Sequence, residues 1–206
     1  ELQVYDDLVL FLLFYRFFSS WRSLHLGNDA QDLSKVWQQF SEEFDRWLGL
    51  PKVRLPSTSD KPHIFAMLYQ VFRAFYHIFD CVVGHSRPAA ELRSRIWQSI
   101  FTYDMRRYRR NLYRNLHEVT TLVTGPSGSG KELVAQAIGR SRYIPFAIKK
   151  QQFEASATDA YIALNVSAFS VNLIESELFG YAKGAFTGAE GTRAGWLETC
   201  GKYGTI

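Results

Sequence analysis

The 206-residue sequence is poor in cysteine, has no long uninterrupted apolar run and carries no strong excess of charge of either sign. Its two cysteines, Cys81 and Cys200, are far apart and lack metal-type spacing, which favours a reducing cytoplasm. The net charge of +4 fits a negatively charged partner without requiring one. A hydrophobic content of 47% and an aromatic content of 16% argue against disorder and suffice for one large domain or two modest ones.

The most apolar stretch, residues 8–18, is too short to cross a membrane. A spanning helix needs about 20 apolar residues, whereas Asp6, Asp7 and Arg16 bound or interrupt this run. The stretch has an acidic rather than a basic leader and no small-residue cleavage site follows, so it does not fit a signal peptide. We therefore expect a buried core helix and no membrane segment.

The next stretch has the periodicity of an amphipathic helix. Asn28 and Asp29 are the expected N-terminal caps, and Gly49 and Pro51 end the pattern before a loop over residues 50–61. The apolar positions recur at three- and four-residue steps and form one stripe: Leu33, Val36, Trp37, Phe40, Phe44, Trp47 and Leu48.

A second amphipathic helix is expected from Pro62, which suits a first helical turn. Its predicted buried face consists of Ile64, Leu68, Val71, Phe72, Phe75 and Phe79. Such aromatic stripes are usually core, and a ligand pocket or a dimer surface is the alternative. The strand-borne aspartates of a phosphoacceptor receiver domain are absent. Residues 1–80 are therefore assigned to a helical N-terminal domain of unknown input.

Residues 103–114 carry five arginines interleaved with tyrosines. Arginine pairs with phosphates and tyrosine stacks on bases, so contact with nucleic acid is one hypothesis. The favoured interpretation is a solvated helix face with Tyr103, Tyr108, Leu112 and Tyr113 turned inward.

A phosphate-binding loop follows. Residues 120–124 are a β-branched run that predicts a buried strand, and a glycine-rich loop, a lysine and a strong helix former come next. The backbone N–H groups, the helix N-terminus and the lysine all supply positive charge to phosphate oxygens. The predicted nucleotide-binding residues are Gly125, Pro126, Ser127, Gly128, Ser129, Gly130, Lys131 and Glu132.

A second distinctive motif lies 53 residues after the lysine. Residues 138–160 are expected to form surface loops with a small hairpin, and residues 161–164 a strand that ends at Asn165. Residues 173–183 then lead into the motif, whose glycines permit a tight tip. Phe186 is a large apolar side chain that suits a contact surface there, and Thr187 can hydrogen-bond to a partner. The motif comprises Gly184, Ala185, Phe186, Thr187, Gly188 and Ala189.

In this order the two motifs resemble one family, the AAA+ ATPase domain of bacterial sigma-54-dependent transcription activators. Glu132 supports the resemblance, because most phosphate-binding loops have Ser or Thr there whereas this family carries Gly-Lys-Glu. Residues 83–89 are similar to the segment that opens the family's ATPase domain. Residues 165–168 resemble its Val-Asn-Cys-Ala-Ala strand end, and residues 193–206 continue the match.

The resemblance implies a cytoplasmic transcription activator that uses ATP and Mg²⁺ to remodel sigma-54 RNA polymerase. Gly184 to Ala189 would contact sigma-54, Asn165 would link the nucleotide state to that loop, and no side chain is predicted as a metal ligand. A homo-oligomeric ring is implied, as are DNA contact through a further C-terminal domain and a regulatory role for residues 1–80. The family's acidic ATPase strand, sensors and arginine fingers are expected beyond Ile206, so whether this chain is an ATPase stays open.

The predicted fold class is α/β, a partial P-loop NTPase (AAA+) domain preceded by a mostly α-helical N-terminal domain. The predicted division is 1–80 and 81–206, with the second part truncated before the Walker B strand. One alternative is a truncated module that binds nucleotide or sigma-54 without hydrolysing ATP. Another is a different P-loop ATPase whose apolar helices bind a partner, against which the 184–189 motif argues.

Overall fold

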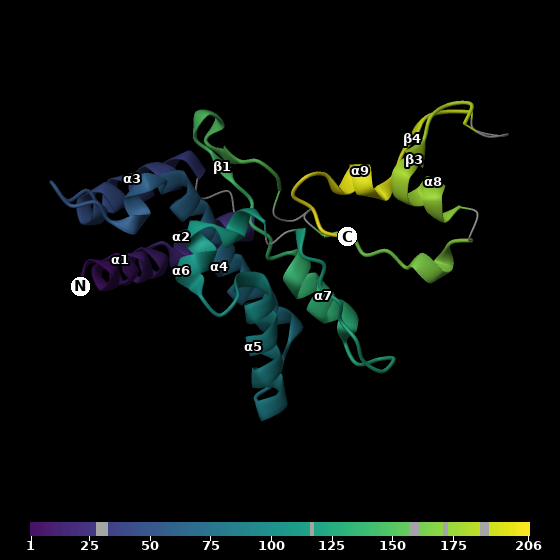
Figure 1. The fold of residues 1–206 in the computed structure, drawn as a ribbon, viewed down its shortest axis with the longest axis horizontal. Coiled ribbons are helices and arrows are strands. Elements are labelled where there is room, and N and C mark those ends of the chain that lie inside the picture. Colours follow the sequence, from purple (N-terminus) through teal and green to yellow (C-terminus); the bar gives the residue numbers. More distant parts are fainter. Residues whose placement is uncertain (28–32, 116–117, 157–160, 171–172, 186–189) are drawn as a thin grey trace.

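The described residues of the first half of the chain are mostly helical (Figure 1). The computed structural model describes residues 1–27, 33–115, 118–156, 161–170, 173–185 and 190–206. The elements of this half are α1 (Leu2–Arg16), α2 (Phe18–His25), α3 (Leu33–Leu48), η1 (Pro56–Ser59), α4 (Lys61–Cys81), α5 (Arg87–Phe101), α6 (Met105–Arg110) and η2 (Leu112–Arg114).

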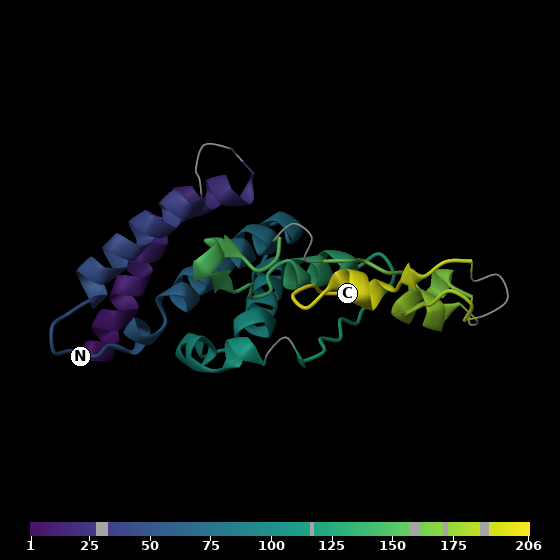
Figure 2. The same ribbon diagram turned by 90° about the horizontal axis from the view of Figure 1, so that it is seen from above.

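The second half contains shorter elements. They are α7 (Lys131–Gly139), β1 (Phe146–Ala147), η4 (Ile148–Lys150), β2 (Gln152–Phe153), η5 (Val166–Ala168), α8 (Ile174–Phe179), β3 (Gly180–Tyr181), β4 (Arg193–Ala194) and α9 (Trp196–Cys200). The part that contains α8, β3 and β4 lies at the opposite end of the molecule from α1 in both views (Figures 1 and 2).

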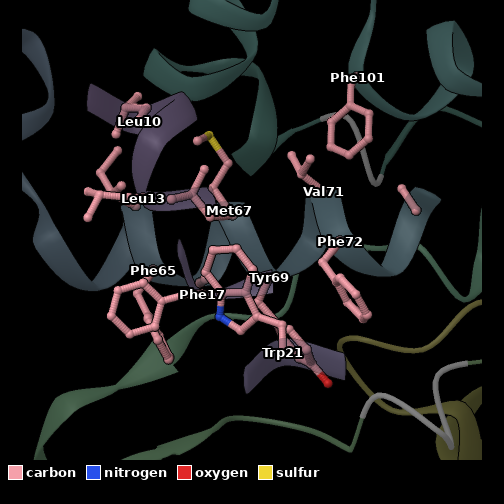
Figure 3. Packing of buried hydrophobic residues seen from close by; sticks show 14 of the residues in the cluster. Leu10, Leu13, Phe17, Trp21, Phe65, Met67, Tyr69, Val71, Phe72 and Phe101 are labelled. Carbon is pink, nitrogen blue, oxygen red and sulfur yellow. The ribbon is translucent and has the colours of Figure 1, made fainter. Parts of the chain in front are cut away.

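Helix α4 is the centre of the core. It begins as predicted, with Pro62 in its first turn and the Asp60 carboxylate accepting a hydrogen bond from the His63 backbone N–H. It packs against α2, α3, α5, α7 and β1. Figure 3 shows side chains of α4 such as Phe65 and Phe72 among those of α1, α2 and α5. Each fully buried large side chain stabilises the fold by about 1.5–3 kcal/mol.

The predicted helix after residue 32 is confirmed as α3. It ends at Leu48, directly before Gly49, and it buries Val36, Phe40, Phe44 and Leu48. The expected caps, Asn28 and Asp29, lie outside the described residues.

The predicted buried face of α4 is correct over its first two thirds and wrong at its end. Ile64, Leu68, Val71 and Phe72 are buried, as predicted, but Phe75 and Phe79 are 41% and 58% exposed. Phe75 packs against the rings of Phe14 and Trp97, with ring centroids 6.2 and 4.7 Å away, and the rest of its surface faces outward.

The prediction of a core helix at residues 8–18 holds for one face. Helix α1 buries Val9, Leu10 and Leu13, whereas Leu8 and Phe11 are exposed. Among the described residues, no helix is both long enough and apolar enough to span a membrane.

The expected α/β architecture is only partly present, because the described residues are mostly helical with a few short strands. The strands form two antiparallel pairs, β1–β2 and β3–β4. The first pair is the small hairpin expected within residues 138–160, with Phe146 opposite Phe153.

The predicted buried strand at residues 120–124 is wrong. This segment has no regular secondary structure, and Leu122 is 85% exposed. The strand expected at residues 161–164 is reduced to one parallel bridge between Tyr161 and Thr205. A strand is stabilised by hydrogen bonds to a neighbour, and isolated pairs are marginal in water; in the described part of the chain, residues 120–124 have no neighbouring strand.

The buried apolar cluster extends across the predicted domain boundary. It includes residues before position 80 and also Ile96, Phe101, Ala137 and Phe146. The division into 1–80 and 81–206 stays a prediction, with the two parts sharing one core.

Candidate functional site

The glycine loop leads directly into α7 and contains glycines with a positive φ. Gly128 and Gly130 adopt φ values of 75° and 82°, a left-handed conformation that side chains other than glycine rarely take. Gly130 is the N-cap of α7, and Lys131 is its first residue. The free N–H groups and positive end of α7 therefore open onto the exposed loop.

Lys131 lies over its own loop. Its Nζ donates to the carbonyl oxygens of Gly125 and Pro126 at 3.1 and 2.6 Å, and Ser129 Oγ donates to the same Pro126 oxygen at 2.8 Å. Both acceptors of the ammonium group are neutral. Anionic phosphate oxygens form stronger, charge-assisted hydrogen bonds and would compete for it. The residues present therefore fit a nucleotide phosphate.

Glu132 follows in the first turn of α7 and is exposed. An acid in the first turn complements the helix dipole. A carboxylate here replaces the hydroxyl that most phosphate-binding loops offer to Mg²⁺. In the described part of the chain, no cluster of three or more histidine, cysteine or acidic side chains could hold a metal ion.

The far end of α7 is held by two buried polar residues of α4. Gln70 Nε2 donates to the Ser141 carbonyl at 2.9 Å, and the Arg73 guanidinium donates to the carbonyls of Arg140 and Arg142. A cation near a helix C-terminus is favourable, and these bonds satisfy the backbone carbonyls of residues that directly follow α7. Helix α4 thus positions the helix that carries the phosphate loop.

Gln70 and Arg73 were not predicted from the sequence. The available signal was the occurrence of two polar residues three positions apart within a run that is otherwise apolar. Tyr108 completes this contact by donating its hydroxyl to Gln70 Oε1 at 2.9 Å. Burial raises the pKa of Tyr108, which keeps the phenol protonated as a donor.

A cleft of about 1390 Å³ runs beside α7 and is lined by Lys131, Glu132 and Asn165 among others. Its walls include residues of the segments 119–123 and 161–165 together with residues 204–206. Gly139 lets the last two segments approach α7 closely, since a Cβ atom there would lie 2.5 Å from the Tyr161 ring. The structure therefore places Asn165 on the same cleft as Lys131.

Asn165 has a local structural role. Its Oδ1 accepts a hydrogen bond from the Ser167 backbone N–H at 3.1 Å and caps η5. This is the turn-capping contact that a strand-end asparagine commonly makes. Its predicted role as a switch residue stays a prediction.

The second motif is described only at its start. Gly184 has a φ of 83° and Ala185 is exposed, whereas Phe186, Thr187, Gly188 and Ala189 lie outside the described residues. The base of the motif is built by the β3–β4 pair and by an ion pair in which Arg193 donates to both oxygens of Glu177, at 2.7 and 3.0 Å.

The arginine-rich segment packs against the acidic start of α1. The Arg109 guanidinium is buried and lies 2.9 Å from Asp6, while Arg106 pairs with Asp7 at 2.5 Å. The Asp6–Arg109 contact is an ion pair without hydrogen-bond alignment, because Arg109 Nη2 has no aligned acceptor in the described structure.

The prediction for the tyrosines of this segment is partly correct. Tyr108 is buried, and Leu112 and Tyr113 are half-buried, but Tyr103 is 87% exposed. Two of the arginines, Arg106 and Arg109, pair with acids of α1, which weakens the nucleic-acid hypothesis for them.

Comparison with known proteins identifies the second half of the chain. Residues 102–206 match the family model of the Sigma-54 interaction domain. The match begins after residues 83–89, whose similarity to the family was expected from the sequence. No solved structure matches.

Curated relatives match over a short region. The Sigma54-dependent transcriptional activator SfnR of Pseudomonas putida is 41% identical over 81 residues, which is 39% of this chain and 19% of that protein. The DNA-binding transcriptional regulator NtrC of Klebsiella pneumoniae is 45% identical over 80 residues, 39% of this chain and 14% of that protein. The matched region is therefore less than a fifth of the length of these relatives.

Proposed function

The chain belongs to the Sigma-54 interaction domain family, and from this premise we propose that it is part of an ATP-dependent activator that remodels sigma-54 RNA polymerase. Relatives named as sigma-54-dependent activators and DNA-binding regulators support this reading. We further propose that the protein acts in the cytoplasm, as a ring of identical subunits, with DNA contact supplied by another domain.

The observation that carries the proposal is the phosphate loop at the N-terminus of α7, inside the matched residues. Lys131 and the N–H groups of residues 125–132 would hold the triphosphate, and Mg²⁺ would neutralise part of its charge. The carbonyl contacts that Lys131 now makes would be exchanged for phosphate oxygens. Asn165 lines the same cleft, which supports its assignment as the residue that senses the nucleotide.

Nucleotide binding is tested with Lys131→Ala and a fluorescent ATP analogue. We expect the affinity to fall by about 100-fold or more, because a charge-assisted contact to phosphate at the positive end of α7 is lost. Lys149→Ala, at an exposed lysine in η4, is the matched control and should bind as the unmodified chain does. If Lys131→Ala binds the ATP analogue with the same affinity as the unmodified chain, the assignment of the loop as a nucleotide-binding site is wrong.

Contact with sigma-54 is tested with Phe186→Ala and Thr187→Ala. Both variants should keep ATP affinity and lose most of their binding to purified sigma-54, measured by biolayer interferometry in the presence of ATP. Tyr103→Ala removes an exposed aromatic ring elsewhere on the chain and serves as control. Unchanged sigma-54 binding by both variants would refute the role of the loop.

A second candidate is a module that binds nucleotide or sigma-54 without hydrolysis. Of the described residues that line the cleft, only Asp60 and Glu132 carry side-chain carboxylates. Neither residue follows an apolar strand, as the acids of the family's ATPase strand are expected to do. A chain that binds the ATP analogue and releases no phosphate from ATP would favour this candidate.

A further inference from the structure

Helix α1 lies at the N-terminal edge of the molecule (Figures 1 and 2). An apolar stripe runs along its exposed face. The opposite face of the helix buries Leu10 and Leu13 in the core. The α1 stripe consists of four side chains that are 55–62% exposed: Val4, Leu8, Phe11 and Tyr15.

The spacing of the α1 stripe is that of a helix-packing seam. Its members follow one another at steps of four, three and four residues. This 3.5-residue period is the heptad pattern by which two helices pack side chains into each other's gaps. A loop or an extended peptide would not require it, so the pattern indicates a helical partner.

Two charged residues of α1 near the stripe are paired within the chain. Asp7 pairs with Arg106 at 2.5 Å, and Arg16 pairs with Glu43 at 2.9 Å. The members of the stripe are themselves uncharged, so the stripe is a poor match for a charged peptide. A helix that lies on a lipid surface usually exposes lysines and arginines on its polar face, whereas the charged residues of α1 are engaged with the rest of the fold.

The apolar surface extends beyond α1. Aromatic ring contacts lead from Tyr15 to Phe14 at 5.8 Å, from Phe14 to Phe75 at 6.2 Å and from Phe75 to Phe79 at 6.3 Å. With side chains of about 150–250 Å² each, the exposed fractions of Phe11, Tyr15, Phe75 and Phe79 amount to roughly 350–550 Å². The aliphatic members add to this, and a standard interface buries roughly 800 Å² per partner.

We propose that the α1 stripe is the seam of a homodimer in which two α1 helices pack antiparallel about a two-fold axis. Such an interface presents the same patch on both subunits and must be self-complementary. The order of side-chain sizes meets this requirement. Antiparallel pairing places Val4 against the partner's Tyr15 and Leu8 against the partner's Phe11, so small residues face large ones in every layer. Parallel pairing would stack Tyr15 on Tyr15 and leave a gap between the two Val4 side chains.

The oligomeric state is tested by sedimentation equilibrium of the full chain without nucleotide, which separates this pairing from the proposed ring. We expect a dimer at micromolar concentration. Leu8→Glu should weaken it by about 100-fold or more, because a central side chain of the seam is replaced by a charge. Leu92→Glu, at an exposed leucine on α5, should leave the dimer intact.

The direction of packing is tested by disulfide formation in a background that carries Cys81→Ala and Cys200→Ala. A mixture of Val4→Cys and Tyr15→Cys chains should form the mixed disulfide, and neither variant alone should cross-link. The two Val4 positions of an antiparallel pair are about 16 Å apart along the axis, at 1.5 Å of rise per residue, which is beyond the reach of a disulfide. Val4 and Tyr15 are exposed, so their substitution by cysteine does not disturb the monomer core.

Three results would overturn the proposal. The first is a chain that stays monomeric at concentrations up to about 100 μM, because its dimer affinity would then be weaker than that of specific homodimers of this size. The second is a dimer whose affinity Leu8→Glu leaves unchanged. The third is a disulfide between two Val4→Cys chains. A monomer that co-sediments with phosphatidylcholine–phosphatidylglycerol vesicles, and loses this on Leu8→Glu, would assign the stripe to a lipid surface instead.

Discussion

At the scale of single residues, Asp6 is one of the buried polar side chains in the described part of the structure. It is fully buried and accepts hydrogen bonds from the Ser57 backbone N–H at 3.1 Å and from Ser57 Oγ at 2.9 Å. The Arg109 guanidinium, also buried, lies 2.9 Å away. Three segments distant in sequence, α1, η1 and α6, thus meet at one carboxylate.

Asp6→Ala should destabilise the chain by about 3–5 kcal/mol, because it leaves the buried Arg109 charge without its closest partner. The free energy of unfolding in urea, followed by far-UV circular dichroism, measures this loss. Asp45→Ala removes an exposed carboxylate from its pair with Lys61 and should cost about 1 kcal/mol or less. Equal effects of the two substitutions would contradict the importance of the buried contact.

His77 is one residue at which we expect acid to destabilise the fold. Burial, the neighbouring His25 ring and the charges of Arg73 and Arg140 lower its pKa from 6.5 to about 3. The His25 ring lies 5.0 Å away, and burial also lowers the pKa of His25. The native state therefore holds His77 neutral at pH values where the unfolded chain protonates it.

Because the folded state binds fewer protons between pH 3 and 6.5, stability should be lost as the pH falls through this window. The urea midpoint recorded from pH 8 to pH 4 tests this. His77→Leu should reduce the fall of the urea midpoint at acidic pH. His85→Leu, at an exposed histidine, should not change the pH dependence of the midpoint. A profile that His77→Leu does not alter would rule out this histidine as a cause of acid sensitivity.

At the scale of elements, helices and strands differ in how well the sequence predicted them. The helices α3 and α4 follow from apolar positions at three- and four-residue steps and from local stop and start signals such as Gly49 and Pro62. The segments 120–124 and 161–164 have β-branched or apolar residues, but their pairing depends on distant partners. The β-propensity of a segment does not predict which distant segment it will pair with.

Gly139 shows how one position joins α7 to the 161–205 bridge. A Cβ atom there would lie 2.5 Å from the Tyr161 ring and 3.2 Å from Thr205. Gly139→Ala should therefore destabilise the chain by about 1–3 kcal/mol through overpacking, although alanine favours a helix. Gly191→Ala, with open space around it, should be nearly neutral. Urea unfolding compares the two, and a neutral Gly139 variant would mean that Tyr161 moves aside freely.

At the scale of the whole molecule, α4 links the helical half to the helix that carries the phosphate loop. It contributes Phe65 and Phe72 to the core and holds the C-terminal end of α7 through Gln70 and Arg73. The buried cluster contains residues from α1 to β1. This continuity indicates that the two predicted domains depend on each other for stability.

A fragment of residues 82–206 should therefore fail to unfold cooperatively and should bind the ATP analogue far more weakly than the whole chain. Removing α4 exposes Ala137 and leaves the carbonyls of Ser141 and Arg140 without their donors. Circular dichroism in urea and fluorescence titration measure both properties. A fragment with a sharp transition and unchanged affinity would instead establish the predicted division as two independent domains.

The sequence by itself determined the features that depend on neighbouring residues. The helix periods, the stop at Gly49 and the glycine loop before Lys131 are local, and the family resemblance rests on short motifs that the match over residues 102–206 bears out. Only the tertiary structure decided which polar residues are buried together and which β-branched segments find a partner. Asp6 with Arg109, and Gln70 with Ser141, are contacts between positions far apart in the chain. Such contacts form only when desolvation of each group is offset by one specific partner in space, and spacing along a sequence does not encode that partner.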